Sequence, residues 1–227
     1  TQKKDCREWK AKTGKGKLGK EESKIIKSQK MSFVESGTVS KDKLIKKDIP
    51  FFEKKFLAAA DVYSSVAAKH DMYIPIRFKS AFIFYKYRHF SEMAKRFGEI
   101  IERYPKNEYA LKAVRLSLNS LYMKATLSDE EKDRNSAWKA VNYWAQTFQK
   151  NQVLMNSPVA RKEKFAPEIQ SLVEESGYNV VLALRKTDAL QAATGFDKFV
   201  NDFPKSKYSH RALYAAMVIY DEANQLD

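Results

Sequence analysis

The chain contains the stretch AKRFGEIIERYPKNEYALKA at residues 94–113 and a second stretch, ATGFDKFVNDFPKSKYSHRA, at residues 193–212. The second stretch follows the first by 99 residues, so that Pro105 falls on Pro204. The same shift matches residues on both sides of the prolines: Ala94 with Ala193, Phe97 with Phe196, Tyr104 with Phe203, Tyr109 with Tyr208, and Ala113 with Ala212. Apolar residues recur every three or four positions, and the proline interrupts the pattern. Each stretch therefore predicts two amphipathic helices joined at its proline.

The shift of 99 residues is three times 33, and an earlier copy of the pattern begins 34 residues before Ala94. A degenerate copy lies around Ala140. A period of 33–34 residues made of two amphipathic helices is typical of a helical solenoid, because one pair cannot bury its apolar face alone and neighbouring pairs stack. We expect the small Ala94 and the large Phe97 in the core of this stack, together with their counterparts Ala193 and Phe196.

The repeated run Ala94-x-x-Phe97…Tyr104-Pro105-Lys-Asn-x-Tyr109 resembles the tetratricopeptide repeat. Its Tyr/Phe-Pro-Lys-Asn/Ser-x-Tyr junction is similar to the subtype found in bacterial envelope proteins, such as the Tol-Pal accessory protein and the lipoprotein of the outer-membrane barrel-assembly machine. The resemblance covers about residues 50–227. It implies an all-α fold class, a helical solenoid of about four stacked antiparallel helix pairs over residues 48–227.

Composition and periodicity agree with this fold class. The 227 residues are 44% hydrophobic, which excludes disorder of the whole chain, and they include only 7 glycines and 6 prolines, too few turn residues for a sandwich or barrel. No stretch alternates as a strand does. We expect a kink at Pro167 in one long helix. The expected helices cover residues 48–67, 76–88, 91–104, 107–121, 128–148, 158–186, 188–203 and 207–222.

Residues 1–47 differ from the rest of the chain. Residues 1–50 contribute +8 of the net charge of +14, and Lys10–Lys20 is rich in glycine and lysine. We expect a basic, partly flexible segment with a weak helix at about 20–35. Gly14-x-Gly16-x-x-Gly19 matches a dinucleotide-binding fingerprint only formally, because no apolar strand precedes it and no βαβ unit follows.

The sequence offers no constellation for catalysis. A single cysteine, Cys6, excludes an internal disulfide framework. His70, His89 and His210 are not linked by any spacing typical of a metal site. We therefore predict a protein that is not an enzyme and that has no catalytic residue, no metal site and no cofactor.

The resemblance also implies a partner-binding face, because the first helix of each tetratricopeptide pair lines the concave groove. This face is basic with interspersed tyrosines, and we expect Lys86 and Arg115 to be exposed on it. Its lysines and arginines suit carboxylates of a partner, and tyrosine offers contact area at low entropic cost. The positions are Lys79, Ile83, Lys86, Tyr87, Lys112, Arg115, Asn119, Tyr122, Arg211, Tyr214 and Val218.

We therefore expect a non-enzymatic protein–protein interaction scaffold or adaptor that binds a peptide or an acidic protein surface, in an envelope assembly or motility complex. The alternative is binding of nucleic acid or an anionic membrane through the basic N-terminal segment, with peripheral membrane contact left open. The resemblance implies the periplasm or cell envelope, with the cytoplasm as the alternative. The chain begins at Thr1 without a methionine and is interpreted as a mature or excised fragment. The oligomeric state is left open.

Overall fold

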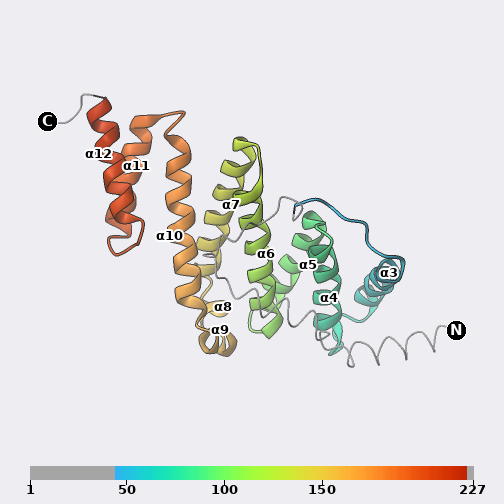
Figure 1. The fold of residues 1–227 in the computed structure, drawn as a ribbon. Helices are drawn as coiled ribbons and strands as arrows, with labels where there is room; N and C mark the ends of the chain where they lie inside the picture. The colour runs from blue at the N-terminus through green and yellow to red at the C-terminus, as the bar shows by residue number, and fades with distance from the viewer. Residues whose placement is uncertain (1–43, 224–227) are drawn as a thin grey trace. The chain divides into compact units, whose positions relative to one another are not determined.

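The computed structural model describes residues 44–223, which form ten α-helices and confirm the all-α fold class (Figure 1). Successive helices pack against one another in antiparallel pairs. The basic segment and the weak helix expected at about 20–35 lie outside the described residues, as does Cys6. The helices are α3 (Phe51–Val66), α4 (Tyr73–Lys86), α5 (Phe90–Arg103), α6 (Glu108–Leu127), α7 (Glu131–Lys150), α8 (Gln152–Met155), α9 (Pro158–Lys162), α10 (Phe165–Leu184), α11 (Ala189–Asp202) and α12 (Ser209–Glu222).

The chain divides into two compact units. In its described part, the N-terminal unit comprises residues 44–120 and 156–160, and the C-terminal unit comprises residues 121–155 and 161–223. The division falls within α6. No helix among residues 44–223 has the length and apolar character needed to cross a membrane.

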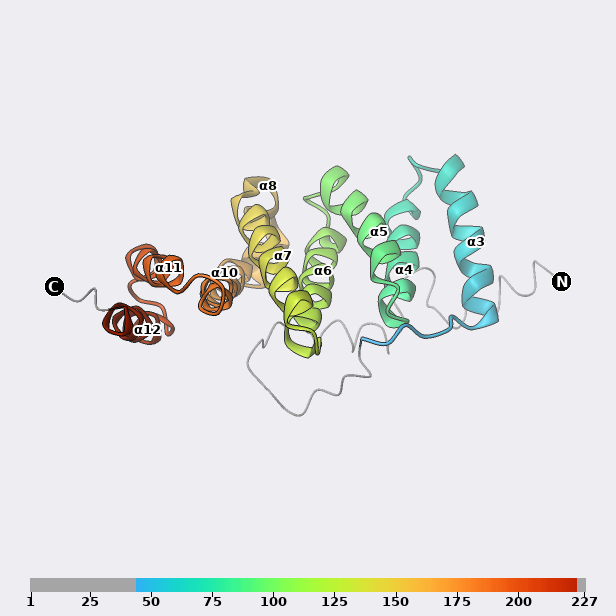
Figure 2. The same ribbon diagram turned by 90° about the horizontal axis from the view of Figure 1, so that it is seen from above.

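In the N-terminal unit, α3 packs on α4 and α4 packs on α5 (Figure 2). The centre of this packing is aromatic. The ring of Phe78 on α4 lies 5.2 Å from that of Phe97 on α5 and 4.9 Å from that of Tyr109 on α6. Aromatic pairs at such distances contribute to stability beyond their buried area.

In the C-terminal unit, α10 packs on both α7 and α11, and α11 packs on α12. The ring of Tyr178 on α10 lies 5.6 Å from that of Phe196 and 5.2 Å from that of Tyr208, so this unit also has three neighbouring rings at its centre. Small residues line the rest of this core and allow the helices to approach closely. The buried cluster consists of Ala192, Ala193, Phe196, Phe199, Ala212, Ala216 and Ile219.

The sequence repeat is also a repeat of local structure. α5 and α11 begin and end 99 residues apart. At both junctions the residue before the proline leaves the helix with φ near −132°, at Tyr104 and Phe203. Next, Asn107 accepts the Tyr109 N–H at 2.9 Å with its side-chain oxygen, and Ser206 accepts the Tyr208 N–H at 3.3 Å. Both side chains offer an oxygen acceptor to a backbone N–H two residues ahead, near the start of the following helix.

Three of the four residues expected in the core are buried, namely Phe97, Ala193 and Phe196. Ala94 is exposed, so that expectation was wrong. Ala193 and Ala94 occupy the same register position, but α10 packs on α11 and covers it, whereas α3 packs on α4. The register fixes the helix face, and the neighbouring helix decides whether that face is buried.

The expected single helix over residues 158–186 is broken, and not at Pro167. The break lies between α9 and α10, where Lys164 adopts a left-handed conformation with φ of 52°. Pro167 is the third residue of α10, in the first turn, where its missing N–H costs no helical hydrogen bond. No kink is needed there.

Two helical glycines should respond oppositely to alanine. A Cβ at Gly98 in α5 would meet nothing within 4 Å, so Gly98→Ala should stabilise the protein by about 0.5–1 kcal/mol through helix propensity. A Cβ at Gly195 in α11 would lie 2.9 Å from Cγ1 of Val181, a rotationally stiff side chain of α10. Gly195→Ala should therefore destabilise it by about 1 kcal/mol net. Urea-unfolding midpoints measure both changes in stability. A shift of both midpoints in the same direction would contradict the packing of α10 on α11.

Candidate binding groove in the C-terminal unit

The eleven residues of the expected partner face fall in both units. α4 carries Lys79, Ile83 and Lys86, and Tyr87 follows directly after it. α6 carries Lys112, Arg115, Asn119 and Tyr122. α12 carries Arg211, Tyr214 and Val218. The first seven belong to the N-terminal unit and the last four to the C-terminal unit.

The four positions at α4 are engaged by neighbouring parts of the same unit. Lys79 is buried, and its Nζ lies 5.7 Å from the ring centre of Phe56 on α3. Ile83 is buried in a cluster that includes Leu57 of α3. Lys86 pairs with Glu53 of α3 at 3.3 Å. The expected open groove is therefore covered by α3 at α4.

The positions on α6 are also engaged. Arg115 has only 8% of its surface exposed, so the expectation that it is exposed was wrong. Asn119 accepts a hydrogen bond from the Tyr85 hydroxyl at 3.0 Å, and Lys112 pairs with Glu108 at 2.9 Å. The reason is that α6 is buried on more than one side, with Leu111, Val114, Leu116 and Leu118 all enclosed. A helix of this kind presents no solvent-facing stripe.

Tyr122 has a structural environment in the C-terminal unit. Its hydroxyl donates to Oε1 of Glu175 on α10 at 2.8 Å, and its ring lies edge-on to that of Trp138 at 5.3 Å. Burial, with the neighbouring Glu175 carboxylate, raises the pKa of the Tyr122 hydroxyl well above its usual range. Tyr122 therefore remains a neutral hydrogen-bond donor within the core.

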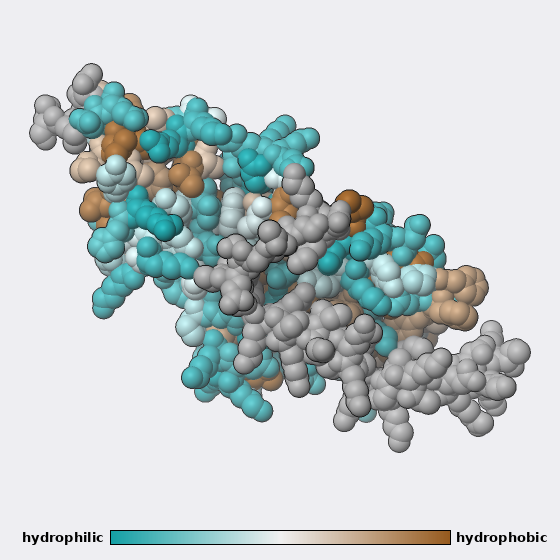
Figure 3. Space-filling view, in the orientation of Figure 1, coloured by the Kyte–Doolittle hydropathy of each residue, from teal (hydrophilic) through white to brown (hydrophobic). Residues whose placement is uncertain are grey.

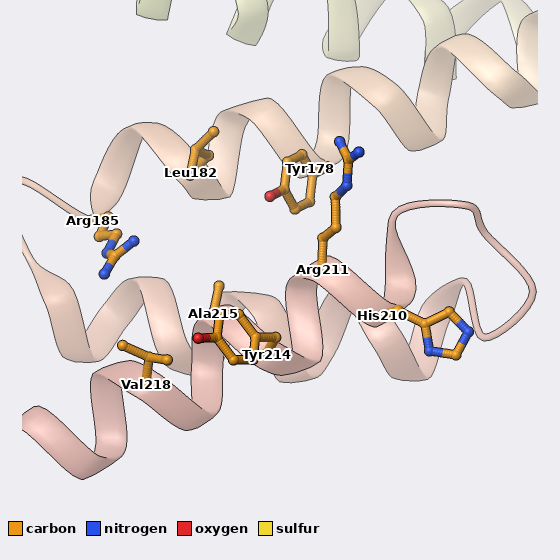
Figure 4. Close-up of a pocket in the computed structure, with 8 residues that line it drawn as sticks. All are labelled: Tyr178, Leu182, Arg185, His210, Arg211, Tyr214, Ala215 and Val218. Carbon is orange, nitrogen blue, oxygen red and sulfur yellow. The ribbon is translucent and has the colours of Figure 1, made fainter.

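The three positions on α12 line a pocket of about 560 Å³ between α10 and α12 (Figure 4). In this close-up α10 and α12 run in the same direction past the pocket, with Arg211 pointing toward Tyr178 and Arg185 lying at the end nearer Leu182 and Val218. Residues of this spacing share one face of a helix, so each helix presents a stripe to the pocket. The lining residues are Tyr178, Leu182 and Arg185 from α10, and His210, Arg211, Tyr214, Ala215 and Val218 from α12.

The charge of this groove is positive and uncompensated. The guanidinium groups of Arg185 and Arg211 make no hydrogen bond or ion pair within residues 44–223, and both residues are exposed. No carboxylate is among the eight lining residues. Leu182, Ala215 and Val218 provide an apolar floor between the two arginines. Figure 3 shows apolar surface over α12 surrounded by hydrophilic surface. The groove is suited to a ligand that has negative charge beside apolar groups.

The same stripe of α10 continues inward to Glu175, one turn before Tyr178. Only 9% of Glu175 is exposed, and its Oε2 is buried without a hydrogen-bond partner in the part of the chain that the structure describes. Burial raises the pKa of this carboxyl, whereas the Tyr122 hydroxyl and Lys207 act to lower it. Burial, with Glu175 as the next cause, raises the pKa of the Tyr208 hydroxyl to about 12. These groups form the polar interior behind the groove.

The histidines have separate roles in the described part of the chain. Nδ1 of His70 accepts the Met72 N–H at 3.2 Å, and Nε2 of His89 lies 2.9 Å from the Lys47 carbonyl oxygen. His210 lines the groove. Within residues 44–223, no three or more histidine, cysteine, aspartate or glutamate side chains are gathered as metal ligands would be.

The sequence named three of the eight lining residues and missed five. Tyr178, Leu182 and Arg185 were missed because no face was assigned to the expected helix at 158–186. Their spacing of four and three residues, repeated by Arg211, Ala215 and Val218, is the signal that would have found them. No protein-family model, no curated protein and no solved structure gives a significant match to the chain.

Proposed function

We propose that this chain is a non-enzymatic scaffold or adaptor that binds a peptide or protein with acidic residues in the groove between α10 and α12. The observation that carries the proposal is that Arg185 and Arg211, at the two ends of an apolar floor, have no ion-pair partner among the described residues 44–223. A guanidinium group binds a carboxylate through two parallel hydrogen bonds, so each arginine suits one acidic side chain.

The exposed apolar side chains of the groove support a peptide or protein ligand. Tyr214 is 65% exposed and Leu182 is 39% exposed, although both border a pocket. Tyrosine and arginine are enriched among the residues that contribute most to binding at protein interfaces. A bound segment would cover these side chains while its carboxylates pair with the arginines.

We further propose that the helix pairs are of the tetratricopeptide type, in the subtype of the bacterial cell envelope. The repeated junction at Tyr104-Pro105 and Phe203-Pro204, with its matching hydrogen bonds, supports this assignment. The corresponding compartment is the periplasm or cell envelope, and the corresponding role is in an assembly or motility complex. The cytoplasm is the alternative compartment.

The second candidate function is binding of nucleic acid or an anionic membrane, favoured by the charge of +8 over residues 1–50. Such binding should weaken steeply as salt concentration rises, because counterions are released from the polyanion. It should also be lost on deletion of residues 1–30. The proposed groove binding should survive that deletion.

Site-specific photocross-linking tests the groove directly. A benzophenone amino acid in place of Tyr214, which is 65% exposed, should cross-link to a partner in native extract. The control is the same replacement at Tyr143 on α7, which is 63% exposed but does not line the groove. We expect a discrete cross-linked product at position 214 and none at 143. Equal products at the two positions, or a product at 143 alone, would place the binding surface elsewhere.

A further inference from the structure

The surface of α4 and α5 that α3 contacts, called the α4–α5 face, carries basic residues that pair with acidic residues of α3. Two of these basic residues also pair within the face, Arg77 with Glu99 at 2.6 Å and Arg96 with Glu92 at 3.2 Å. Asp61 of α3 accepts a hydrogen bond on each of its carboxylate oxygens from one nitrogen of Arg96, at 2.9 and 3.0 Å. Arg77 of α4 approaches the same carboxylate at 3.4 Å. Eight residues earlier, Glu53 pairs with Lys86 at 3.3 Å. α3 thus bridges this face with two carboxylates about 12 Å apart along its axis.

Apolar residues of α3 fill the space between these two carboxylates. Leu57 packs against Ile83 of α4, and the ring of Phe56 lies under the Lys79 ammonium group. Ala60 is buried as well. The residues of α3 that contact the face therefore recur every three or four positions. They are Glu53, Phe56, Leu57, Ala60 and Asp61, so that an acidic residue stands at each end of three apolar ones. This is the pattern of one face of an amphipathic helix.

α3 fits this face imperfectly. Leu57 and Ala60 are its two buried residues, whereas α4 has eight. Within residues 44–223, three buried polar atoms of α3 have no hydrogen-bond partner: Oε2 of Glu53, the Tyr63 hydroxyl and the Ser64 hydroxyl. Nε of Arg96, on the face that α3 covers, is also unpaired. Unpaired buried polar groups and few buried apolar contacts weaken a helix's attachment.

The other side of α3 is apolar and open to solvent. Phe51, Phe52, Val62 and Val66 are all exposed, and Figure 3 shows apolar surface over this helix. A helix held mainly by three ion pairs and one short apolar stripe is a natural candidate for exchange with another helix.

We propose that the α4–α5 face is a second docking surface, for an acidic amphipathic helix of a partner protein, and that α3 is its intramolecular occupant. The partner helix carries carboxylates at positions equivalent to Glu53 and Asp61, with apolar residues at the positions of Phe56, Leu57 and Ala60. This surface lies in the N-terminal unit, and the proposal does not depend on the groove between α10 and α12.

The short connection between α3 and α4 determines how tightly a separate helix can bind the α4–α5 face. Residues 67–72 join the two helices, so α3 is held near its face at a high effective concentration. A free helix of the same sequence should therefore bind the wild-type chain weakly. It should bind well once the chain's own α3 has lost its charges.

The experiment uses a fluorescein-labelled synthetic peptide of residues 51–66 as the probe. The test variant is the full chain with Glu53→Gln and Asp61→Asn, which removes the three ion pairs that these carboxylates make and leaves the α4–α5 face unchanged. We expect the variant to bind the peptide at least about tenfold more tightly than the wild type does, as measured by fluorescence anisotropy. Hydrogen exchange in α3 should be faster in the variant, while α4 and α5 remain protected.

Two controls make the result specific. A chain with Asp202→Asn and Glu222→Gln, the same charge change at exposed positions of α11 and α12, should bind the peptide as weakly as the wild type. A peptide with glutamine and asparagine in place of its own Glu53 and Asp61 should not bind the test variant. In the unmutated chain, excess charged peptide should displace the chain's own α3 and so accelerate its hydrogen exchange. This second measurement does not need the test variant, so it tests the proposal even if that variant fails to fold.

Several outcomes would overturn the proposal. They are unchanged protection of α3 in the variant, equal binding of the charged and neutral peptides, and no acceleration of α3 exchange by excess peptide in the unmutated chain. Light scattering could instead show that the variant forms a dimer in which α3 is exchanged between copies. The helix that binds the α4–α5 face would then come from a second copy of this chain, which would overturn the assignment to a partner protein.

Discussion

Replacing Phe97 by alanine should lower the free energy of unfolding by about 3–5 kcal/mol, the usual loss when a buried phenylalanine is truncated. Phe97 is 0% exposed, and its ring lies 5.2 Å from that of Phe78 in the centre of the N-terminal unit. The substitution removes the buried apolar surface and leaves a cavity between α4 and α5 that rigid helices fill only in part. Chemical denaturation of the purified variant measures the loss.

The matched control is Phe52→Ala on α3, because Phe52 is 83% exposed. The same atoms are removed from a solvent-facing position, so the unfolding free energy should change by less than about 0.5 kcal/mol. A small loss at Phe97, or equal losses at both positions, would show that the register of the repeat had been misassigned.

The repeat was predictable from sequence because its determinants are local. Pro105 and Pro204 end a helix wherever it packs, and the side chains of Asn107 and Ser206 accept backbone N–H groups two residues ahead. These requirements are met within a few residues of the chain. The matching ends of α5 and α11, 99 residues apart, follow from them.

Burial was less predictable because it depends on neighbours. Ala94 and Ala193 have the same register, yet only Ala193 is buried, since α10 packs on α11. Arg115 is buried because α6 is enclosed on more than one side, and Lys79 is buried beneath α3. Periodicity identifies one apolar face of a helix and does not reveal which further face a neighbour will cover.

The groove between α10 and α12 was predictable only in part for the same reason. The tetratricopeptide register led to Arg211, Tyr214 and Val218 on α12, and these residues do line the pocket. The facing stripe with Tyr178 and Arg185 belongs to α10, in a region where the repeat is degenerate. Pairing the two stripes required the positions of both helices.

Reversing the charge of both arginines in the groove should reduce partner binding by at least about 100-fold. Each arginine–carboxylate pair is expected to contribute at least ~1.4 kcal/mol, a factor of ten, and the introduced glutamates add repulsion. Arg185 and Arg211 are exposed and have no ion pair within residues 44–223, so the double variant Arg185→Glu with Arg211→Glu should fold normally. Its melting temperature should stay within a few degrees of the wild type.

The control has the same change in charge outside the groove. Lys139 and Lys150 on α7 are exposed and do not line the pocket. The double variant Lys139→Glu with Lys150→Glu should retain full binding. The comparison therefore separates an effect of the groove from a general effect of net charge.

Quantitative capture of partners from native extract by these three immobilised chains tests the central claim most directly. The wild type and the Lys139→Glu, Lys150→Glu variant should retain the same acidic partner in equal amounts, and the Arg185→Glu, Arg211→Glu variant should lose it while keeping its melting temperature. Equal capture by all three chains would contradict the assignment of the groove between α10 and α12 as the binding site.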